Sequence, residues 1–359
     1  MQSLLNKKNV DYTKQPLFLG EGLSLQRYDR FKYPIFFDMF KKQMEFFWRP
    51  EEIELKKDRN DFKNDDVMSE NERFIFTSNL KYQTMMDSVI CRGVPTLMQF
   101  VSNPELEACM NVWQFFEQIH SYSYTYIIKN VYSNPSEILD SCLTDKEILK
   151  RADVTVKEYD ALNHGDISKM SKKQLKKQIY LTIISVNILE AVRFYVSFIC
   201  AFAFAENKKM VGNADIIKLI KRDEALHLYN TQEIIKILMS NPEEGFLETA
   251  KECEEEACKM FERAAAEEKA WASYLFQNGS IIGLNEQVMS EYVDHLCMSR
   301  RQKIGLPFEK KRNPIAGWTD PWMNSESVQV APQEHEITSY KIGASKNDLE
   351  DTDFGGFDL

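Results

Sequence analysis

The sequence predicts an all-α protein, because residues that break helices are scarce and apolar residues recur at helical spacing. The 359 residues include only 13 glycines and 11 prolines, the two residue types that most disfavour a helix interior. Hydrophobic residues make up 43% of the chain, which is enough for one large core or two modest ones. We therefore expect long helices packed as a bundle.

The chain divides into an N-terminal arm at residues 1–33, a helical domain at residues 34–312 and a tail at residues 313–359. Start and stop signals mark three helices in the first part of the helical domain. They are expected from residue 34 to a stop or bend at Pro50, from a cap at Ser69 or Asn71 to about Cys91, and from an Asn103 cap with Pro104 as first helical residue to about Tyr132.

The rest of the helical domain is dominated by one long apolar run. Residues 133–174 predict shorter helices and loops. The expected elements after them are a long helix at residues 175–206, a helix that starts at an Asn213 cap, and two helices that begin near residues 245 and 285.

The apolar run at residues 175–206 raises the question of a membrane span. Glu190 and Arg193 lie at its middle, and charges at the centre of a bilayer are costly. A helix that is apolar all round also suits the centre of a large soluble bundle. We therefore expect a core helix and no membrane association.

Composition favours a cytoplasmic protein. The formal net charge is −10, which gives no reason to expect nucleic-acid binding. Seven cysteines without a CxxC pair argue against a disulfide framework or a zinc ribbon. The first residues contain no apolar stretch of the kind found in signal peptides. These features together predict a reducing compartment.

The tail at residues 313–359 lacks helical periodicity and is rich in Pro, Gly, Ser and acids. Such a composition is typical of an extended segment, and plain disorder is one interpretation. The end of the tail carries three apolar residues among its acids, Phe354, Phe357 and Leu359. This is unusual for a tail whose only role is to keep the protein in solution. A docking peptide is therefore our hypothesis for this end.

Two Glu-x-x-His motifs are the strongest indication of chemistry. Glu117 and His120 share one helix face, and so do Glu224 and His227. Two such matches alone are weak evidence, because solvated polar pairs show the same spacing. Their surroundings are apolar, however, and a buried unpaired charge costs several kcal/mol or more. The glutamate of each motif therefore needs a strong partner for its charge.

Two further acids complete a repeated pattern. Asp87 and Glu190 each stand alone on an apolar helical face, and each precedes one of the Glu-x-x-His motifs by about thirty residues. Ferritin-like di-metal bundles place ligands in this way, with one carboxylate from each of two helices and Glu-x-x-His from the other two. We therefore predict a ferritin-like helical bundle with a buried dinuclear metal site, in which Asp87 stands where such bundles usually carry Glu.

Charge and ligand type indicate the metal. Four carboxylates carry −4 and two divalent ions carry +4, so the site is neutral only with both ions present. Oxygen-rich ligands with one imidazole for each metal, and no thiolate, suit iron or manganese better than structural zinc. The ligand sets for these two metals overlap, so the sequence leaves the choice open.

Tyr124 lies on the same helix face as Glu117 and His120, whereas Tyr122 does not. It is either a buried residue that fills space or a phenol that the metal pair oxidises after reaction with dioxygen. Phe194 and Phe198 share the face of Glu190 by their spacing. An apolar pocket beside the metals is therefore plausible.

Six segments give the chain a resemblance to a known family. They are SNLKYQTMMDS, EQIHSYSYTYIIKN, NILEAVRFYVSF, RDEALH, GSIIGLN and VQVAPQEHEITSY. With FFWRPEE at the start, the chain resembles the small, radical-generating subunit of class I ribonucleotide reductase of the aerobic bacterial or phage type. The similarity extends over nearly the whole chain.

The resemblance implies a role for each candidate residue. It implies a homodimer that binds two iron ions per subunit, with manganese possible, uses dioxygen and an electron donor, and docks its C-terminus on the large subunit to start deoxyribonucleotide synthesis. The implied metal ligands are Asp87, Glu117, His120, Glu190, Glu224 and His227. The implied radical residues are Tyr124 as the stable radical, Trp48, Asp223 and Tyr340 as transfer residues, and Phe194, Phe198 and Ile220 as the radical pocket.

Two alternatives and one departure remain. A di-iron or Mn/Fe oxidase of the same fold would share the six ligands without needing Trp48 or Tyr340, and a ferritin-like iron-binding protein would need no radical pocket. Tyr122 stands where the family often has a polar or basic residue, so a second oxidisable phenol stays open. The sequence contains no Gly-rich phosphate cradle, so we expect the partner to bind the nucleotide.

Overall fold

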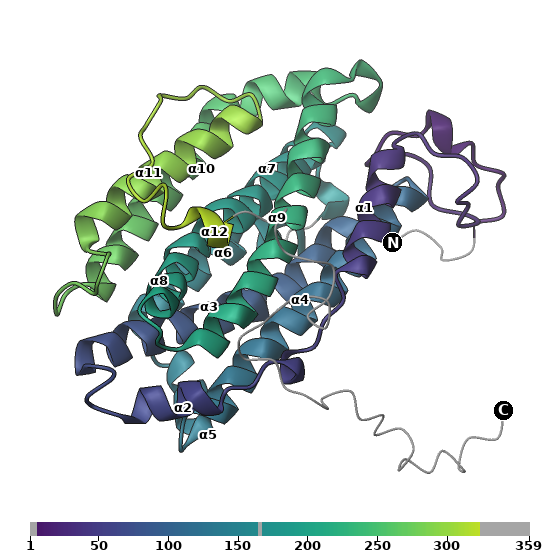
Figure 1. Ribbon diagram of the computed structural model, residues 1–359. Coiled ribbons are helices and arrows are strands. Elements are labelled where there is room, and N and C mark those ends of the chain that lie inside the picture. The colour runs from purple at the N-terminus through teal and green to yellow at the C-terminus, as the bar shows by residue number, and fades with distance from the viewer. Residues whose placement is uncertain (1–5, 164–166, 324–359) are drawn as a thin grey trace, which may run out of the picture.

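The computed structural model describes residues 6–163 and 167–323. Within these residues the regular structure is helical, apart from two isolated β-bridges (Figure 1). The all-α prediction is therefore confirmed. The α-helices are α1 (Pro34–Glu45), α2 (Lys56–Lys63), α3 (Glu70–Met98), α4 (Pro104–Val131), α5 (Pro135–Cys142), α6 (Lys146–Asn163), α7 (Lys172–Ile188), α8 (Tyr195–Glu206), α9 (Val211–Ser240), α10 (Leu247–Leu275), α11 (Glu286–Lys303) and α12 (Asp320–Met323). A π-helix, η4 (Leu189–Arg193), joins α7 to α8, and 3₁₀ turns lie at Tyr12–Lys14, Pro50–Glu52, Ile167–Lys169 and Pro242–Glu244.

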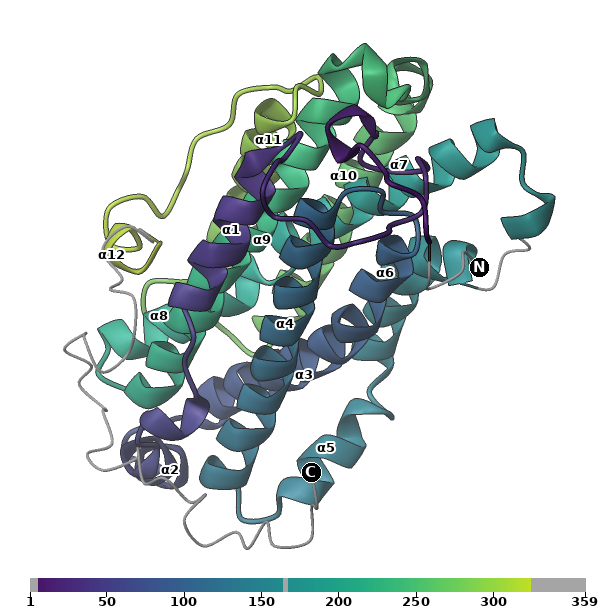
Figure 2. The same ribbon diagram turned by 90° about the vertical axis from the view of Figure 1, so that its right-hand side faces the viewer.

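The long helices surround one shared core. Helix α3 packs against α4, α7 and α8 pack against α9, and α4 also contacts α9. Figure 2 shows α1 lying along α4 on one side of the bundle, in agreement with the contacts between these helices. The four chain segments that carry the predicted ligands therefore meet in the middle of the molecule.

The apolar run forms the centre of the bundle. The stretch Lys172–Glu206 is long and apolar enough to cross a membrane by composition, yet 94% of its most apolar window is buried inside the protein. The structure divides this run into α7, η4 and α8, where the sequence predicted one continuous helix. The π-turn contains Glu190, so the change in helical repeat occurs at a predicted ligand.

Helix α3 is longer than expected, because it continues through Pro95 to Met98. A proline cannot donate to the carbonyl four residues before it, which here belongs to Cys91. The Cys91 carbonyl instead accepts a hydrogen bond from Gln114 Nε2 of α4 at 3.4 Å. The neighbouring helix thus satisfies the group that the proline leaves free.

The expected Asn213 cap of the ninth helix is wrong, because α9 already begins at Val211. Asp58 of α2 caps this end instead, accepting from the Gly212 amide at 3.0 Å and from the Asn213 amide at 2.5 Å. A Cβ on Gly212 would lie 2.7 Å from the Glu54 carbonyl oxygen, so this close approach requires glycine. Helix α2 was not expected from the sequence.

Both ends of the described chain are fastened to the bundle. Buried Glu244 accepts hydrogen bonds from the Leu17 amide and the Tyr33 hydroxyl, both at 2.5 Å. In α12, the Trp322 ring stacks on Phe202 at 5.0 Å. Tyr340 and the proposed docking peptide lie outside the described residues.

Candidate metal centre

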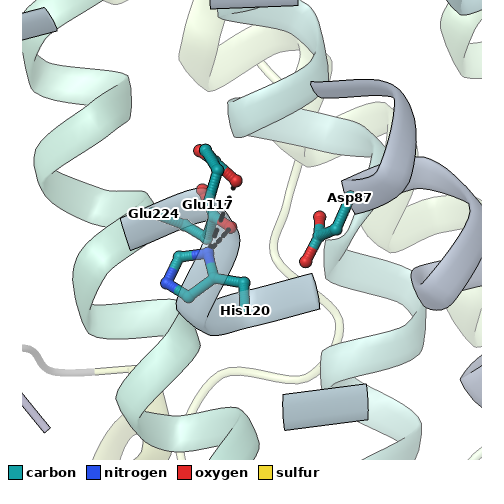
Figure 3. Close-up of side chains that lie close together, drawn as sticks. All are labelled: Asp87, Glu117, His120 and Glu224. Carbon is teal, nitrogen blue, oxygen red and sulfur yellow. Dashed lines mark ion pairs between the residues drawn. The ribbon is translucent and has the colours of Figure 1, made fainter. Parts of the chain in front are cut away.

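The six predicted ligands lie together in the core. They form two overlapping groups, and in each group every residue offers one ligand atom that lies within 4.8 Å of those of the others. One group contains Asp87, Glu117, His120 and Glu224, and the other contains Glu117, Glu190, Glu224 and His227. All six side chains are fully buried. Figure 3 shows the first group, with Asp87 facing the other three from α3.

Glu117 and Glu224 belong to both groups. His120 Nδ1 lies 3.0 Å from Glu224 Oε1 and 3.5 Å from Glu117 Oε2. His227 Nδ1 lies 2.9 Å from Glu117 Oε1 and 3.1 Å from Glu224 Oε2. Each of these carboxylates therefore presents one oxygen to each histidine, which is the arrangement needed to bridge two cations.

Unpartnered oxygens show that the cluster fits a pair of cations. Both carboxylate oxygens of Asp87 and both of Glu190 are buried without a hydrogen bond from any described residue. A buried polar group left in this way costs about 1–3 kcal/mol, and more when charged. Two divalent cations would satisfy these oxygens and neutralise the four carboxylates. Carboxylate and imidazole ligands together suit iron or manganese.

The electrostatics lead to the same conclusion. Burial raises the pKa of Asp87 well above its usual range, and the neighbouring carboxylates of Glu117 and Glu224 raise it further. Burial, followed by the charge of Glu224, does the same to the pKa of Glu190. Burial therefore disfavours the ionised form of both carboxyl groups in the absence of cations, and metal binding is expected to release protons.

Tyr124 is fully buried beside the first group. Burial first, and then the charges of Asp87 and Glu224, raise its pKa well above its usual range. Its hydroxyl makes no hydrogen bond of good geometry with a described residue, although it lies close enough to Asp87 for the two groups to interact. The phenol of Tyr124 therefore stays protonated and lies beside the Asp87 carboxyl group.

The three residues of the predicted radical pocket, Phe194, Phe198 and Ile220, are also fully buried. The two phenylalanine rings stack on each other with centroids 5.8 Å apart. The three side chains carry no polar atom and are shielded from solvent.

A hydrogen-bonded chain leads away from the first group. Trp48 Nε1 donates to Asp223 Oδ2 at 2.7 Å, and His120 Nε2 lies 3.2 Å from the same oxygen. Arg222 contacts the other oxygen of Asp223 at 3.2 Å. All four side chains are buried. The structure thus places Trp48, Asp223 and His120 in one continuous path.

Sequence reasoning missed Trp113, which serves the second group. Its indole Nε1 donates to Glu117 Oε1 at 2.7 Å, and its ring stacks on His227 at 5.1 Å. A signal was present in the sequence, because Trp113 stands four residues before Glu117 and therefore on the same helix face.

Sequence reasoning also missed the contacts of Arg193 at the end of the π-turn. This buried side chain contacts Glu267 Oε2 at 2.7 Å and Glu268 Oε1 at 3.7 Å, both in α10. These contacts span more than seventy residues, so no local pattern could predict them. They hold the turn that carries Glu190.

Comparisons with known proteins agree with this geometry. The sequence profile of the family "Ribonucleotide reductase, small chain" matches residues 26–314. The ribonucleoside-diphosphate reductase subunit beta of Buchnera aphidicola subsp. Baizongia pistaciae is 46% identical, over 99% of this chain and 98% of that protein. Its counterpart in Escherichia coli O157:H7, ribonucleoside-diphosphate reductase 1 subunit beta, is 43% identical over 97% of both chains. A solved ribonucleotide reductase R2 subunit from Clostridium botulinum superposes with a TM-score of 0.80 at 28% identity, covering 90% of this chain and 98% of that one.

Proposed function

Because the chain belongs to the ribonucleotide reductase small-chain family, we propose that its six buried ligands hold the metal pair and that Tyr124 carries the radical. The family membership establishes the activity itself. The chain is the small, radical-generating subunit of ribonucleoside-diphosphate reductase, works with a large subunit and contains a dinuclear iron or manganese centre. The predicted fold, enzyme activity and metal type are thereby confirmed.

The sharing of Glu117 and Glu224 between the two groups carries the ligand assignment. These two carboxylates would be shared by the two cations, since each contacts both histidines. Asp87 and Glu190 are then the terminal carboxylates, because each belongs to one group only. His120 and His227 each supply one imidazole nitrogen.

The residues around the cluster have separate tasks. When bound, the two iron or manganese ions supply electrons to dioxygen. Tyr124 gives up one electron and its hydroxyl proton, and the Asp87 carboxylate, which interacts with this hydroxyl, is a candidate to receive that proton. Phe194, Phe198 and Ile220 keep water away from the oxidised phenol. Their burial supports long storage of the radical.

Transfer to the partner uses the path through Trp48, Asp223 and His120. Asp223 Oδ2 holds the indole proton of Trp48 in a hydrogen bond, so an electron that leaves this ring has a proton acceptor at hand. Lys221 Nζ donates to the Met323 carbonyl, which fastens the last described residue to α9, the helix that carries Asp223. From Met323 the chain to Tyr340 spans at most about 58 Å when extended, and we propose that Tyr340 continues the path toward the large subunit.

Further parts of the proposal concern partners and location. We place the protein in the cytoplasm, as a homodimer that uses dioxygen and an external electron donor and docks its C-terminal tail on the large subunit. A candidate contact for the second copy is the exposed stacked pair Phe47 and Phe115, with centroids 6.2 Å apart. Exposed aromatic pairs are typical of protein contacts.

Electron paramagnetic resonance tests the central assignment. The metal-free protein is loaded with Fe(II) without oxygen and then exposed to air. We expect a tyrosyl signal that is absent in Tyr124→Phe and retained in Tyr126→Phe, whose hydroxyl bonds the Ile53 carbonyl at 2.9 Å on another side of α4. The absence of any organic radical with iron, manganese or a mixture of the two would refute the assignment.

A further inference from the structure

A strongly basic segment begins in the last turn of α11. Residues 300–312, which we call the basic segment, contain six basic residues and one acid, so their formal charge is +5 in a chain of net charge −10. The dipole of a helix stabilises cations in its last turn, which accounts for the first three bases. The other three follow the end of the helix, so the dipole does not explain them. The six bases are Arg300, Arg301, Lys303, Lys310, Lys311 and Arg312.

The structure holds the basic segment in a defined turn. The Leu306 amide donates to the Arg301 carbonyl at 3.0 Å, and the side chains of Ile304 and Leu306 are buried. His295 Nδ1 lies 3.1 Å from the Lys311 carbonyl oxygen, so the chain turns back along α11 before it continues to α12 (Figure 1). The bases before and after the turn therefore lie on adjacent stretches of the chain.

Three of the exposed bases have no acid to neutralise them. Lys303, Lys310 and Arg312 are exposed and make no ion pair within the part of the chain that the structure describes. Lys311 is exposed as well, and its ammonium group lies 2.7 Å from Glu309 Oε2. Positive charges gathered in this way attract anionic partners.

An exposed aromatic ring lies among these charges. Phe308 is 47% exposed, although Ile304 and Leu306 of the same turn are buried. One exposed apolar side chain alone is ordinary on a protein surface. Here it stands between Lys303 and Lys310 in the sequence. The partner that fits this surface best therefore carries negative charge together with aromatic side chains.

The chain itself contains a segment of this kind. Residues 347–359, which we call the acidic segment, contain five acids and no base. Their formal charge of −5 is opposite to the +5 of the basic segment. Phe354 and Phe357 stand among these acids. The acidic segment lies outside the described residues, so its sequence alone identifies it as the occupant.

The length of the chain permits the contact. Lys221 Nζ donates to the Met323 carbonyl, which fastens the last described residue to α9. Arg312 precedes Met323 by eleven residues, so the two lie at most about 37 Å apart. Phe354 follows Met323 by 31 residues, and these span up to about 105 Å when extended. The acidic segment is therefore able to reach the basic segment of its own chain.

We propose that the basic segment binds the acidic segment of the same chain, with Phe308 packed against the phenylalanines of the acidic segment. The inference rests on the proposed function in one respect, because the acidic segment is also the peptide that docks on the large subunit. The basic segment and the large subunit then compete for one peptide. Salt screens exposed charges, so the contact within the chain weakens as the ionic strength rises.

Carbodiimide cross-linking of the full-length protein tests the contact, because this reagent joins an amine only to a carboxylate that touches it. We expect mass spectrometry to find links between lysines of the basic segment and acids of the acidic segment. Raising sodium chloride from about 0.05 M to about 0.5 M shortens the screening length roughly threefold and should reduce these links severalfold. Phe308→Ala should reduce them at both concentrations. No links in the wild type at low salt would overturn the proposal.

Affinity for the large subunit provides the second test. The triple variant Lys310→Glu, Lys311→Glu and Arg312→Glu should bind the large subunit severalfold more tightly at low salt, because its acidic segment is no longer held. Unchanged affinity would overturn the proposal. Weaker affinity would also overturn it, since the basic segment would then contact the large subunit itself. The matched control reverses three exposed lysines of α6 and α7 and should bind like the wild type: Lys146→Glu, Lys150→Glu and Lys172→Glu.

The two levels of the proposal fail in different ways. If deletion of residues 347–359 leaves full activity with the large subunit, the proposed docking role of the tail is wrong. If this deletion abolishes the activity and the full-length protein gives no cross-links, only the contact with the basic segment is wrong.

Discussion

The two Glu-x-x-His motifs have the same spacing, but the structure gives their histidines different neighbours. The far nitrogen of His120 meets Asp223, which leads on to Trp48. The Nε2 atom of His227 has no hydrogen bond to a described residue, and its ring stacks on Trp113. The His120 half of the cluster is thus connected to the buried path through Asp223 and Trp48, and the His227 half is packed against an aromatic ring.

This difference teaches that equal ligands need not have equal tasks. Both halves share Glu117 and Glu224, so both can hold a cation. Only the His120 half has Tyr124 beside it and the Trp48 path behind it. The His227 half is carried by the π-turn and is supported by Arg193. We therefore expect storage and transfer of the radical to depend on the first half and support of Glu190 on the second.

The largest expected effect comes from removing a carboxylate that the His120 half and the His227 half of the cluster share. Glu224→Ala takes a bridge from both groups, so the protein should bind almost no metal and form no radical. Asp87→Ala takes a ligand from the His120 half only, and should leave about one metal ion per subunit in the other half. Metal content after gel filtration distinguishes these outcomes, and Glu190→Ala is the mirror control. Equal metal loss in Glu224→Ala and Asp87→Ala would contradict the bridging role.

The next largest effect is expected from changing the neighbours of the two histidines, Asp223 beside His120 and Trp113 beside His227. Changes to groups that support metal ligands typically cost 10–100-fold in metal affinity, so both Asp223→Asn and Trp113→Phe should weaken metal binding. Only Asp223→Asn should abolish turnover with the large subunit, because it alone interrupts the path to Trp48. The measurement is activity divided by the Tyr124 radical content. An equal ratio in the two variants would remove the functional difference between the halves.

The sequence was sufficient for the cluster because its signals are local. Glu-x-x-His spacing and lone acids on apolar faces are properties of single helices, and they identified all six residues that the structure brings together. The sharing of Glu117 and Glu224 depends on how α4 crosses α9, which no single helix encodes. The π-turn at Glu190 and the cap that Asp58 places on α9 depend on distant partners as well.

A smaller effect concerns the support of the His227 half. Burial raises the pKa of Glu268 to about 7, and this residue contacts Arg193 at the end of the π-turn. The folded protein therefore binds more protons than the unfolded chain between about pH 4.5 and 7, and stability falls as the pH rises through this window. The full effect amounts to about 3 kcal/mol.

Glu268→Gln tests this effect, because glutamine can still accept the Tyr82 hydrogen bond but cannot ionise. Urea unfolding of the metal-free protein at pH 5 and pH 8 gives the free energy of unfolding. The wild type should lose about 2.5 kcal/mol more than the variant between these two values. Asp58, whose pKa burial also raises to about 7, should behave in the same way in Asp58→Asn. Parallel pH profiles of wild type and Glu268→Gln would show that Glu268 does not titrate in this range.

The smallest expected effect distinguishes the two tyrosines that follow His120. Tyr122 is 48% exposed and its hydroxyl donates to Glu51, whereas Tyr124 is fully buried. Surface substitutions of this kind usually change the free energy of unfolding by less than about 0.5 kcal/mol, so Tyr122→Phe should unfold like the wild type.

The electron paramagnetic resonance spectrum of Tyr122→Phe should also keep its shape, and the yield of the radical should be unchanged. A phenoxyl radical at Tyr122 would be open to water and to reductants in solution, and it would have no apolar pocket to preserve it. A lower yield or an altered spectrum in this variant would mean that the oxidising equivalent passes through the exposed phenol. In that case helix phase would not be enough to decide which tyrosine stores it.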